Sequence, residues 1–286
     1  TRRGGVGKTT TAVNVAAALA LQGGLNTLVI DLDPQGNAST ALGIEHRPGT
    51  PSSYEVLIGG EIPLRDALQR SPHSDRLYCV PATIDLAGAE IELVSMVARE
   101  GRLRSALASL TDYNFDYVFI DCPPSLGLLT INAFVAAPEV LIPIQCEYYA
   151  LEGVGQLMRT IEMVKAHLNP QLDVTTVILT MYDGRTKLAD QVASDVRAHF
   201  GDKVLRTVIP RSVKVSEAPG YGMTILGYDP PGSRGGDELL GREPRDRGAA
   251  AVMSRQTPAE QESRHDPTNT QAQRSRTRPR VAHSDR

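Results

Sequence analysis

Short apolar runs alternate along the chain with stretches in which apolar residues recur at helical spacing. Six runs are predicted to be strands: residues 26–33, 76–82, 115–121, 140–145, 174–180 and 204–209. Runs such as VFID and VILT are apolar at successive positions, which is typical of strands covered on both faces. Residues 9–21 and the stretches around Leu157 and Val192 repeat their apolar positions as helices do. This order of elements predicts a doubly wound, mainly parallel α/β sheet with helices on both faces.

The pattern changes near residue 236. Residues 1–236 carry every predicted strand and are enough to bury one sizeable core. From Arg242 onward the chain contains no Leu, Ile, Phe or Tyr and is rich in Arg, Pro, Ser, Thr and Gln. Such a segment buries too little apolar surface to offset the entropy of ordering. We therefore expect one domain over residues 1–236 and a disordered, Arg-rich tail over residues 237–286.

The composition narrows the possible chemistry. A net charge of -3 gives no global sign of nucleic-acid binding, so any such contact would be a local patch. Cys79, Cys122 and Cys146 lie far apart in apolar stretches without a C-x-x-C pair, and we expect buried, reduced thiols. The sequence shows no bilayer-spanning apolar stretch and no signal peptide, which predicts a cytoplasmic protein without a membrane partner.

Acidic residues stand where several predicted strands end. Asp31 and Asp33 close the first run, Asp121 closes the third, and Asp183 comes just after the fifth. In open α/β sheets, ligands bind at the carboxyl ends of the strands. We therefore expect the chemistry to gather at this edge.

The segment RRGGVGKTTT at the start of the chain resembles a phosphate-binding loop. The pattern G-x-x-x-x-G-K-[ST] is met at Gly7, Lys8 and Thr9 but has Arg2 in place of its first glycine. Such a loop points backbone N–H groups and the positive end of a helix at a phosphate. Lys8 would neutralise the terminal phosphates, and the Thr9 hydroxyl would hold Mg²⁺. The alternative is a glycine-rich turn that happens to precede a helix.

The strand-end carboxylates favour the phosphate site over the simple turn. Asp33 is followed by Pro34, which ends the strand, and its carboxylate could orient or deprotonate an attacking water. Asp121 ends the run YVFID and could reach Mg²⁺ directly or through water. The phosphate-binding loop, Asp33 and Asp121 occur in the order that a nucleotide site requires, so helix capping is the minor interpretation of the two aspartates.

Five segments in order are similar to motifs of one family: GGVGKTT after a basic residue, DLDPQGN, DCPPS, TMYDGRT and IPRSVKVSEAPGYG. They resemble the ParA/Soj chromosome- and plasmid-partitioning ATPases, in the deviant Walker A group that also includes MinD. The match runs from Arg3 to about Gly235. The resemblance implies an ATP- and Mg²⁺-dependent ATPase that forms an ATP-dependent homodimer. It further implies binding to non-specific double-stranded DNA of the nucleoid and stimulation by a ParB-like, centromere-binding protein.

The resemblance also implies roles for individual residues. Asp33 resembles the aspartate that positions the hydrolytic water, and Asp121 resembles the Walker B aspartate. The deviant Walker A loop would comprise Gly4, Gly5, Val6, Gly7, Lys8, Thr9 and Thr10. The adenine-packing loop would contain Pro210 and Arg211, and the DNA-binding positions would be Arg185 and Lys214. Further cations are nearby in sequence, and we expect the whole set to form a cluster near the end of the sheet that favours a DNA face: Lys187, Lys203, Arg206 and Arg211.

Arg3 stands where the family carries a signature lysine that reaches the phosphates of the partner in the dimer. Arginine keeps the charge, but its planar guanidinium is not interchangeable with a lysine ammonium at a tight contact. We expect Arg3 to permit ATP binding and to impair hydrolysis, so that Arg3→Lys raises turnover in a chain that has its first strand.

Two alternatives remain. A MinD-like positioning ATPase would need a C-terminal amphipathic helix, and the tail has no apolar face. The other alternative is an inactive fragment. A P-loop needs a strand before its glycines, and only Thr1 to Arg3 precede them here. The segment GDELLGREPRDRG also lacks the closing helix pattern of the family, which a frameshift near Gly235 would explain. If the sequence were the whole protein, the missing first strand would predict poor solubility or a rearranged sheet edge.

Overall fold

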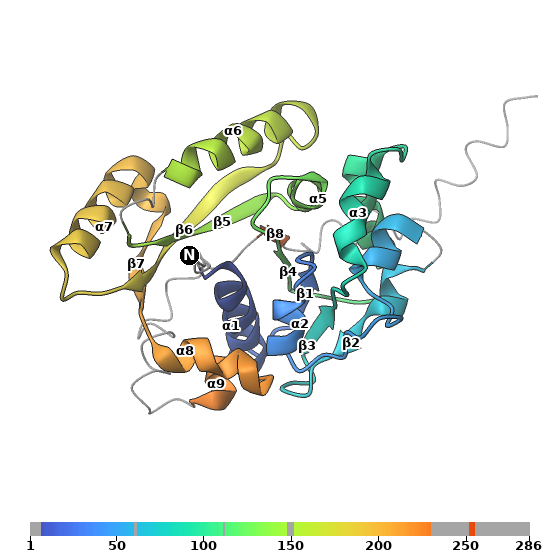
Figure 1. Cartoon of the computed structure of the whole chain (residues 1–286), viewed down its shortest axis with the longest axis horizontal. Helices are drawn as coiled ribbons and strands as arrows, with labels where there is room; N and C mark the ends of the chain where they lie inside the picture. The colour runs from blue at the N-terminus through green and yellow to red at the C-terminus, as the bar shows by residue number, and fades with distance from the viewer. Residues whose placement is uncertain (1–6, 60–61, 111, 148–151, 230–251, 255–286) are drawn as a thin grey trace, which may run out of the picture. The chain divides into compact units, whose positions relative to one another are not determined.

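The computed structural model describes residues 7–59, 62–110, 112–147, 152–229 and 252–254. Over these residues the chain forms an eight-stranded sheet in the order β2-β3-β1-β4-β8-β5-β6-β7 (Figure 1). The strands are β1 (Thr27–Asp31), β2 (Gln69–Arg70), β3 (Leu77–Val80), β4 (Tyr117–Asp121), β5 (Glu139–Gln145), β6 (Asp173–Tyr182), β7 (Val204–Pro210) and β8 (Val252–Ser254). All six predicted strands are present, and β2 and β8 are additions to them.

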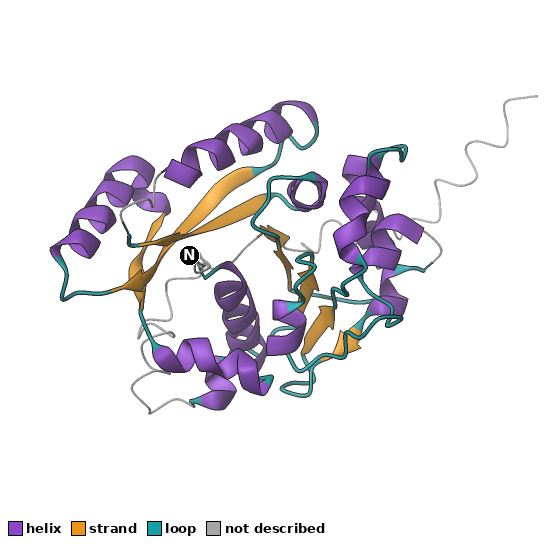
Figure 2. Ribbon diagram, in the orientation of Figure 1, coloured by secondary structure: helices purple, strands orange, loops and turns teal. Residues whose placement is uncertain are grey.

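Helices connect the strands and cover the sheet (Figure 2). The α-helices are α1 (Lys8–Leu21), α2 (Asn37–Ala41), α3 (Leu86–Leu93), α4 (Arg102–Ala108), α5 (Leu128–Ala136), α6 (Glu152–His167), α7 (Lys187–Phe200), α8 (Val213–Glu217) and α9 (Ile225–Tyr228). Short turns of other helix types are η1 (Glu55–Gly59), η2 (Leu64–Ala67), η3 (Arg99–Gly101), η4 (Gly201–Lys203) and η5 (Ala218–Tyr221).

The sheet is mainly parallel and is buried on both faces. β1 pairs in parallel with β3 and β4, and β6 pairs in parallel with β5 and β7. Successive residues of a strand point to opposite faces. Thus Leu28 and Ile30 join the core that includes α3, α5 and α6, whereas Val29 joins the core beneath α1. The predicted fold class, a doubly wound sheet with helices on both faces, is confirmed.

β8 departs from what the composition of the tail predicts. Its three residues lie within 237–286, the segment expected to be disordered, yet they pair antiparallel with β4 at Phe119 and with β5 at Val140. A compact unit accordingly extends over Thr1–Arg255, beyond the expected boundary at residue 236. The other tail residues lie outside the described part of the chain, and their disorder stays a prediction.

The three cysteines are free thiols, as expected. Cys79 and Cys146 are buried and Cys122 is partly buried. Burial raises the pKa of Cys146 to about 11, and burial likewise raises the pKa of the other two thiols. Thiols with a raised pKa hold little reactive thiolate. In the part of the chain that the structure describes, no helix is both long and apolar enough to cross a membrane.

Candidate functional site

The amino end of α1 lies at the carboxyl edge of the sheet. Gly7 precedes the helix with φ of 85°, a left-handed conformation that favours glycine. A Cβ at Gly7 would lie 3.8 Å from the Thr180 side chain of β6, so loop and strand are in close contact. Lys8, Thr9 and Thr10 form the first helical turn. This end of α1 offers the N–H groups and positive dipole that bind anions.

The remaining loop positions named from the sequence are Arg3, Gly4, Gly5 and Val6. They lie outside the described residues. Their assignment to the phosphate loop, and the proposed role of Arg3 in a partner's site, stay predictions.

Two carboxylates meet where β1 and β4 end. Asp31 and Asp121 are paired in register as the last residues of these strands, and both are fully buried. Neither carboxylate oxygen of Asp121 has a hydrogen-bond partner among the described residues. Burial, and after it the charge of Asp31, raises the pKa of Asp121 to about 8, while the Thr9 hydroxyl and the Lys8 ammonium oppose this shift. Asp121 therefore faces the first turn of α1 as a carboxylate that lacks a counterion of adequate strength.

Asp31 is tied into the loop that follows β1. Its carboxylate accepts hydrogen bonds from the Ser39 N–H at 2.9 Å, the Ser39 hydroxyl at 2.7 Å and the Asp33 N–H at 3.1 Å. The Ser39 oxygen in turn accepts from the Ala82 N–H at 3.1 Å. Burial raises the pKa of Asp31 to about 6, although these hydrogen bonds favour the ionised form. Asp31 thereby connects the ends of β1 and β3 to the start of α2.

Asp33 lies in this same loop and is half-buried. Its Oδ1 accepts from the Gln35 N–H at 3.0 Å, and its carbonyl accepts from the Gly36 N–H at 2.9 Å. Gly36 has φ of 62°, and a Cβ there would lie 2.9 Å from the Nδ1 atom of His46. The backbone around Asp33 is thus fixed from both sides. The negative charge of Asp33 also raises the pKa of Asp121, so the two side chains share one site.

These groups fit a hydrated magnesium ion bound together with phosphates. Mg²⁺ prefers oxygen ligands and is usually bound by one or two carboxylates, water and substrate phosphates. Asp121 supplies an unpaired, buried carboxylate, and Thr9 supplies a hydroxyl beside it. Within the described ranges, no group of three or more His, Cys, Asp or Glu side chains makes a metal site by itself. A cation at this place would depend on the phosphates for further ligands.

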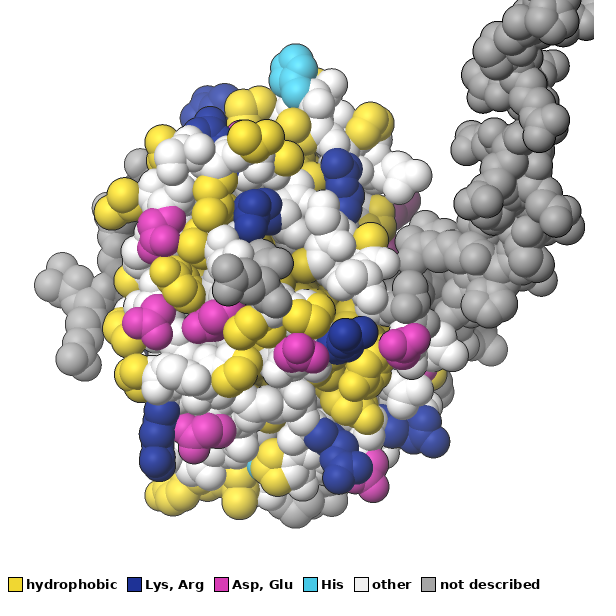
Figure 3. All heavy atoms as spheres, turned by 90° about the vertical axis from the view of Figure 1, so that its right-hand side faces the viewer, with side chains coloured by type: hydrophobic (Ala, Val, Ile, Leu, Met, Phe, Trp, Pro, Cys, Tyr) yellow, Lys and Arg dark blue, Asp and Glu magenta, His cyan; other side chains and the backbone are white. Residues whose placement is uncertain are grey.

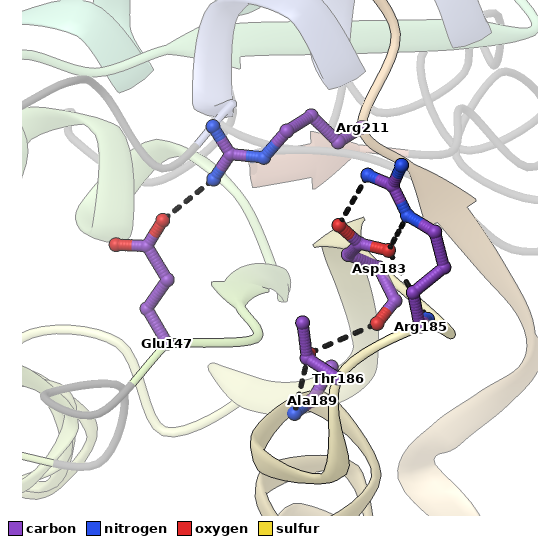
Figure 4. Close-up of polar contacts among 6 residues, drawn as sticks. All are labelled: Glu147, Asp183, Arg185, Thr186, Ala189 and Arg211. Carbon is purple, nitrogen blue, oxygen red and sulfur yellow. Dashed lines mark hydrogen bonds and ion pairs between the residues drawn. The ribbon is translucent and has the colours of Figure 1, made fainter.

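The residues expected beside adenine follow β7. Pro210 ends that strand opposite Tyr182, and the Arg211 N–H donates to the Tyr182 carbonyl at 3.1 Å. The Arg211 guanidinium forms an ion pair of 2.6 Å with Glu147 after β5 (Figure 4). The backbone of this segment is well anchored to the sheet, whereas the adenine contact stays a prediction.

The residues expected to bind DNA are exposed, and each pairs with an acid. Arg185 follows β6 and pairs with Asp183 at 2.7 Å, and Lys214 of α8 pairs with the buried Asp229 at 3.0 Å. The grouping of the nearby cations from the sequence was partly wrong. Lys203 pairs with Asp173 at the amino end of β6, and β6 is ten residues long, so this end lies roughly 30 Å from the carboxyl end.

Arg206 is the third residue of β7, a strand whose first residue pairs with Val177 midway along β6. Because β7 runs parallel to β6 and reaches the carboxyl edge only at Pro210, Arg206 lies short of that edge. Residues that are close in sequence therefore separate along the strand. Figure 3 views the molecule from the side of α3, and there the described Lys, Arg, Asp and Glu side chains are interspersed among apolar ones. This face does not present a basic surface.

Two structural residues of the site were missed from the sequence. Ser39 supports Asp31, as described above. Asn14 lies buried in α1, donates to the Thr10 carbonyl at 2.7 Å and accepts the Ile225 N–H of α9 at 2.7 Å. A polar residue within an alanine-rich helical stripe was the signal that could have identified Asn14.

Comparison with known proteins agrees with this geometry. A family model described as an AAA domain matches residues 1–174. The sporulation initiation inhibitor protein Soj of Bacillus subtilis (strain 168) is 51% identical over 239 residues, covering 84% of this chain and 92% of that protein. This chain belongs to the ParA/Soj family of chromosome-partitioning ATPases.

A second curated relative and a solved structure are also similar to this chain. The chromosome partitioning protein ParA of Caulobacter vibrioides (strain NA1000 / CB15N) is 53% identical over 229 residues, covering 80% of this chain and 85% of that protein. Among solved structures, cobyrinic acid a,c-diamide synthase from Mycobacterium smegmatis with bound ADP and magnesium superposes with a TM-score of 0.67. It is 42% identical and covers 78% of this chain and 89% of its own. The ParA/Soj motifs recognised in the sequence thus identified the family correctly.

Proposed function

We propose that this chain hydrolyses ATP with Mg²⁺ at the carboxyl edge of β1 and β4. The observation that carries the proposal is Asp121, a fully buried carboxylate without a hydrogen-bond partner among the described residues, beside Lys8 and Thr9. An isolated buried carboxylate is costly unless it is neutralised or paired. A divalent cation that arrives with the nucleotide would supply the missing positive charge. The similar cobyrinic acid a,c-diamide synthase from Mycobacterium smegmatis is known with bound ADP and magnesium, which supports this proposal.

Each side chain has one task in this proposal. Lys8 neutralises the terminal phosphates, and the Thr9 hydroxyl and Asp121 hold Mg²⁺. The bound ion would offset the negative charge that develops on the phosphate oxygens. Asp33 orients the attacking water and accepts its proton. Asp31 holds the Asp33 loop through its bond to the Asp33 N–H and does not itself react.

The proposal extends to DNA, as the ParA/Soj family suggests. The ATP-bound homodimer would bind non-specific duplex on the nucleoid through Arg185 and Lys214, and a ParB-like partner would stimulate hydrolysis. Dimerisation doubles the number of phosphate contacts, so affinity would fall when ADP monomers form. Arg3 would reach the phosphates of the second copy. Phosphate contacts of this kind bind without sequence preference and weaken as salt increases.

Two measurements test the function. Phosphate release by the purified chain should require both ATP and Mg²⁺ and should rise with duplex DNA and a cognate ParB-type protein. Failure to bind ATP with Mg²⁺ would reject the nucleotide site. Duplex binding should be tighter with a non-hydrolysable ATP analogue than with ADP, and equal binding in the two states would reject the DNA switch while leaving the nucleotide site intact.

A further inference from the structure

Arg185 is folded back onto the carboxylate of a residue two positions earlier. Its Nε donates to Oδ1 of Asp183 at 2.8 Å, and its Nη2 donates to Oδ2 at 2.7 Å (Figure 4). The Arg185 side chain is 88% exposed, whereas the Asp183 side chain is 26% exposed. This bidentate ion pair lowers the pKa of Asp183 to about 2. A guanidinium that faces solvent is therefore held by an acid in the chain itself.

The loop that carries the pair is rigid. The Thr186 N–H and the Thr186 hydroxyl both donate to the Asp183 carbonyl at 3.0 Å, which closes a four-residue turn. The same hydroxyl caps α7 by accepting the Ala189 N–H at 3.3 Å. The Arg185 N–H also donates to Oδ1 of Asp183 at 3.1 Å. These bonds hold Asp183 and Arg185 in one arrangement, so the ion pair is already formed before any duplex binds.

The ion pair occupies one of the two donor edges of the Arg185 guanidinium that a phosphate could use. Arginine grips carboxylates and phosphates alike with two parallel N–H donors of its planar fork. Asp183 already accepts from one such pair, Nε and Nη2. A DNA phosphate that approaches this edge also meets the negative charge of Asp183, and like charges at short range repel. A phosphate at the Nε edge would have to displace Asp183, and a phosphate at the remaining donors would still meet the negative charge of Asp183.

We infer that Asp183 is an anionic latch that competes with DNA phosphates for Arg185 and limits the affinity of the chain for duplex. The inference rests on the proposed DNA-binding function and adds a residue that opposes it. Exposed ion pairs are weak, so an opened latch should raise affinity by about two- to fivefold per chain. A dimer that engages both copies would gain up to the square of that factor.

The test is Asp183→Asn in the full chain. Asparagine keeps the oxygen that accepts the Arg185 N–H, so the turn persists while the negative charge is lost. Affinity for a fluorescent non-specific duplex, measured by anisotropy with a non-hydrolysable ATP analogue, should rise by about two- to fivefold or more over wild type. Asp183→Glu retains the charge and should remain near wild type. The midpoint of thermal unfolding, recorded for each variant, should not change.

Two controls separate the latch from a general change in charge. Asp202→Asn removes one exposed negative charge in η4, the turn that precedes β7, and should leave affinity nearly unchanged. The double variant Asp183→Asn/Arg185→Ala should show no gain over Arg185→Ala. Wild-type binding without a gain in Asp183→Asn, or an equal gain in the double variant, would overturn the latch alone. Duplex binding by neither wild type nor Asp183→Asn would overturn both the latch and the proposed DNA function.

Discussion

Three aspartates end strands at the same edge of the sheet, and the protein treats them in opposite ways. Asp31 and Asp121 are fully buried, and burial raises their pKa values to about 6 and about 8. Asp183 is partly exposed to solvent and bound to Arg185, whose hydrogen bonds lower the pKa of Asp183 to about 2. The Lys8 ammonium near the buried pair does not offset the effect of burial, so a further cation would stabilise the ionised carboxylates. Asp183 is already paired with the Arg185 guanidinium, so a ligand at this place can only release that pairing.

The difference separates two kinds of site. At β1 and β4 the strand register brings the two buried carboxylates together, so the folded protein is destabilised when no cation is bound there. At β6 the interaction is local, between residues two positions apart, and little else depends on it. We expect changes at the first region to alter chemistry and stability strongly and changes at the second to alter binding mildly.

The largest effect should follow removal of the Asp33 carboxylate, which we propose orients the attacking water. Asp33→Ala should lower the rate of ATP hydrolysis by about 100- to 10,000-fold, because general-base assistance is lost, while ATP still binds. Single-turnover phosphate release and equilibrium nucleotide binding distinguish the two steps. Asp75→Asn, which removes an exposed carboxylate paired with Arg70, is the matched control and should hydrolyse ATP normally. Unchanged hydrolysis in Asp33→Ala would assign the water to another residue.

A pH experiment addresses the buried pair directly. Because the folded pKa of Asp121 is raised, its contribution to stability is complete below the unfolded value near 3.8 and is lost as the pH rises towards about 8. Asp31 acts in the same direction up to about pH 6. Without Mg²⁺, Asp121→Asn should therefore raise the free energy of unfolding at pH 8 by about 1–3 kcal/mol and change it less at pH 5.

Urea unfolding in a metal chelator at pH 5, 6.5 and 8 provides this measurement. Addition of Mg²⁺ with a nucleotide should stabilise wild type at pH 8 more than Asp121→Asn, since only the carboxylate binds the ion. Parallel pH dependences for the two chains would show that Asp121 is not the buried titrating group.

A smaller effect should come from the support behind Asp31. Ser39→Ala removes a hydroxyl that donates to Asp31 and accepts from the Ala82 N–H, and leaves both partners buried. The free energy of unfolding should fall by about 1–2 kcal/mol, and hydrolysis should decline as the Asp33 loop loosens. Ser95→Ala removes an exposed hydroxyl that donates to the Glu92 carbonyl and should change stability by less than about 0.5 kcal/mol. An equal loss of unfolding free energy in Ser39→Ala and Ser95→Ala would show that the hydrogen bonds of Ser39 contribute no more than those of an exposed serine.

The smallest change in the folded protein is expected at the exposed edge. Arg185→Ala should reduce the salt dependence of duplex binding by about one phosphate contact and leave the unfolding free energy within about 0.5 kcal/mol of wild type. Lys203→Ala is the comparison, since Lys203 lies at the opposite end of β6 with Asp173. A loss of duplex affinity in Lys203→Ala equal to that in Arg185→Ala would mean that the DNA surface is not confined to the carboxyl edge.

The sequence predicted the parts of this protein that depend on regular patterns. Apolar runs gave the six longer strands, and Asp31 and Asp121 at the ends of two runs indicated the nucleotide edge, because parallel strands bring their carboxyl ends together. The two residues of β2 and the three of β8 are too short for periodicity to reveal. β8 is held by hydrogen bonds to β4 and β5, which are distant in sequence, and the composition of the segment around β8 does not predict this pairing.

Side-chain partners were harder to predict than strands. Lys203 and Arg206 were grouped with Arg185 because they follow it in sequence, but Lys203 pairs with Asp173 at the amino end of β6 and Arg206 lies partway along β7. The partner of Arg185, by contrast, was within reach of sequence reasoning. The segment Asp-Gly-Arg-Thr is a turn in which aspartate accepts bonds from the residues that follow it, and this places the two charges side by side.

The hydrogen bond between Asn14 and Ile225 joins residues that are 211 positions apart. A contact between such distant positions forms only after most of the chain has been gathered, since loop closure must precede it. The Ile225 amide is therefore expected to exchange its hydrogen with solvent only when the fold opens as a whole. One slowly exchanging amide in a short helix would then report the global opening of the molecule, and its exchange rate would show whether a bound nucleotide holds α1 and α9 together more firmly.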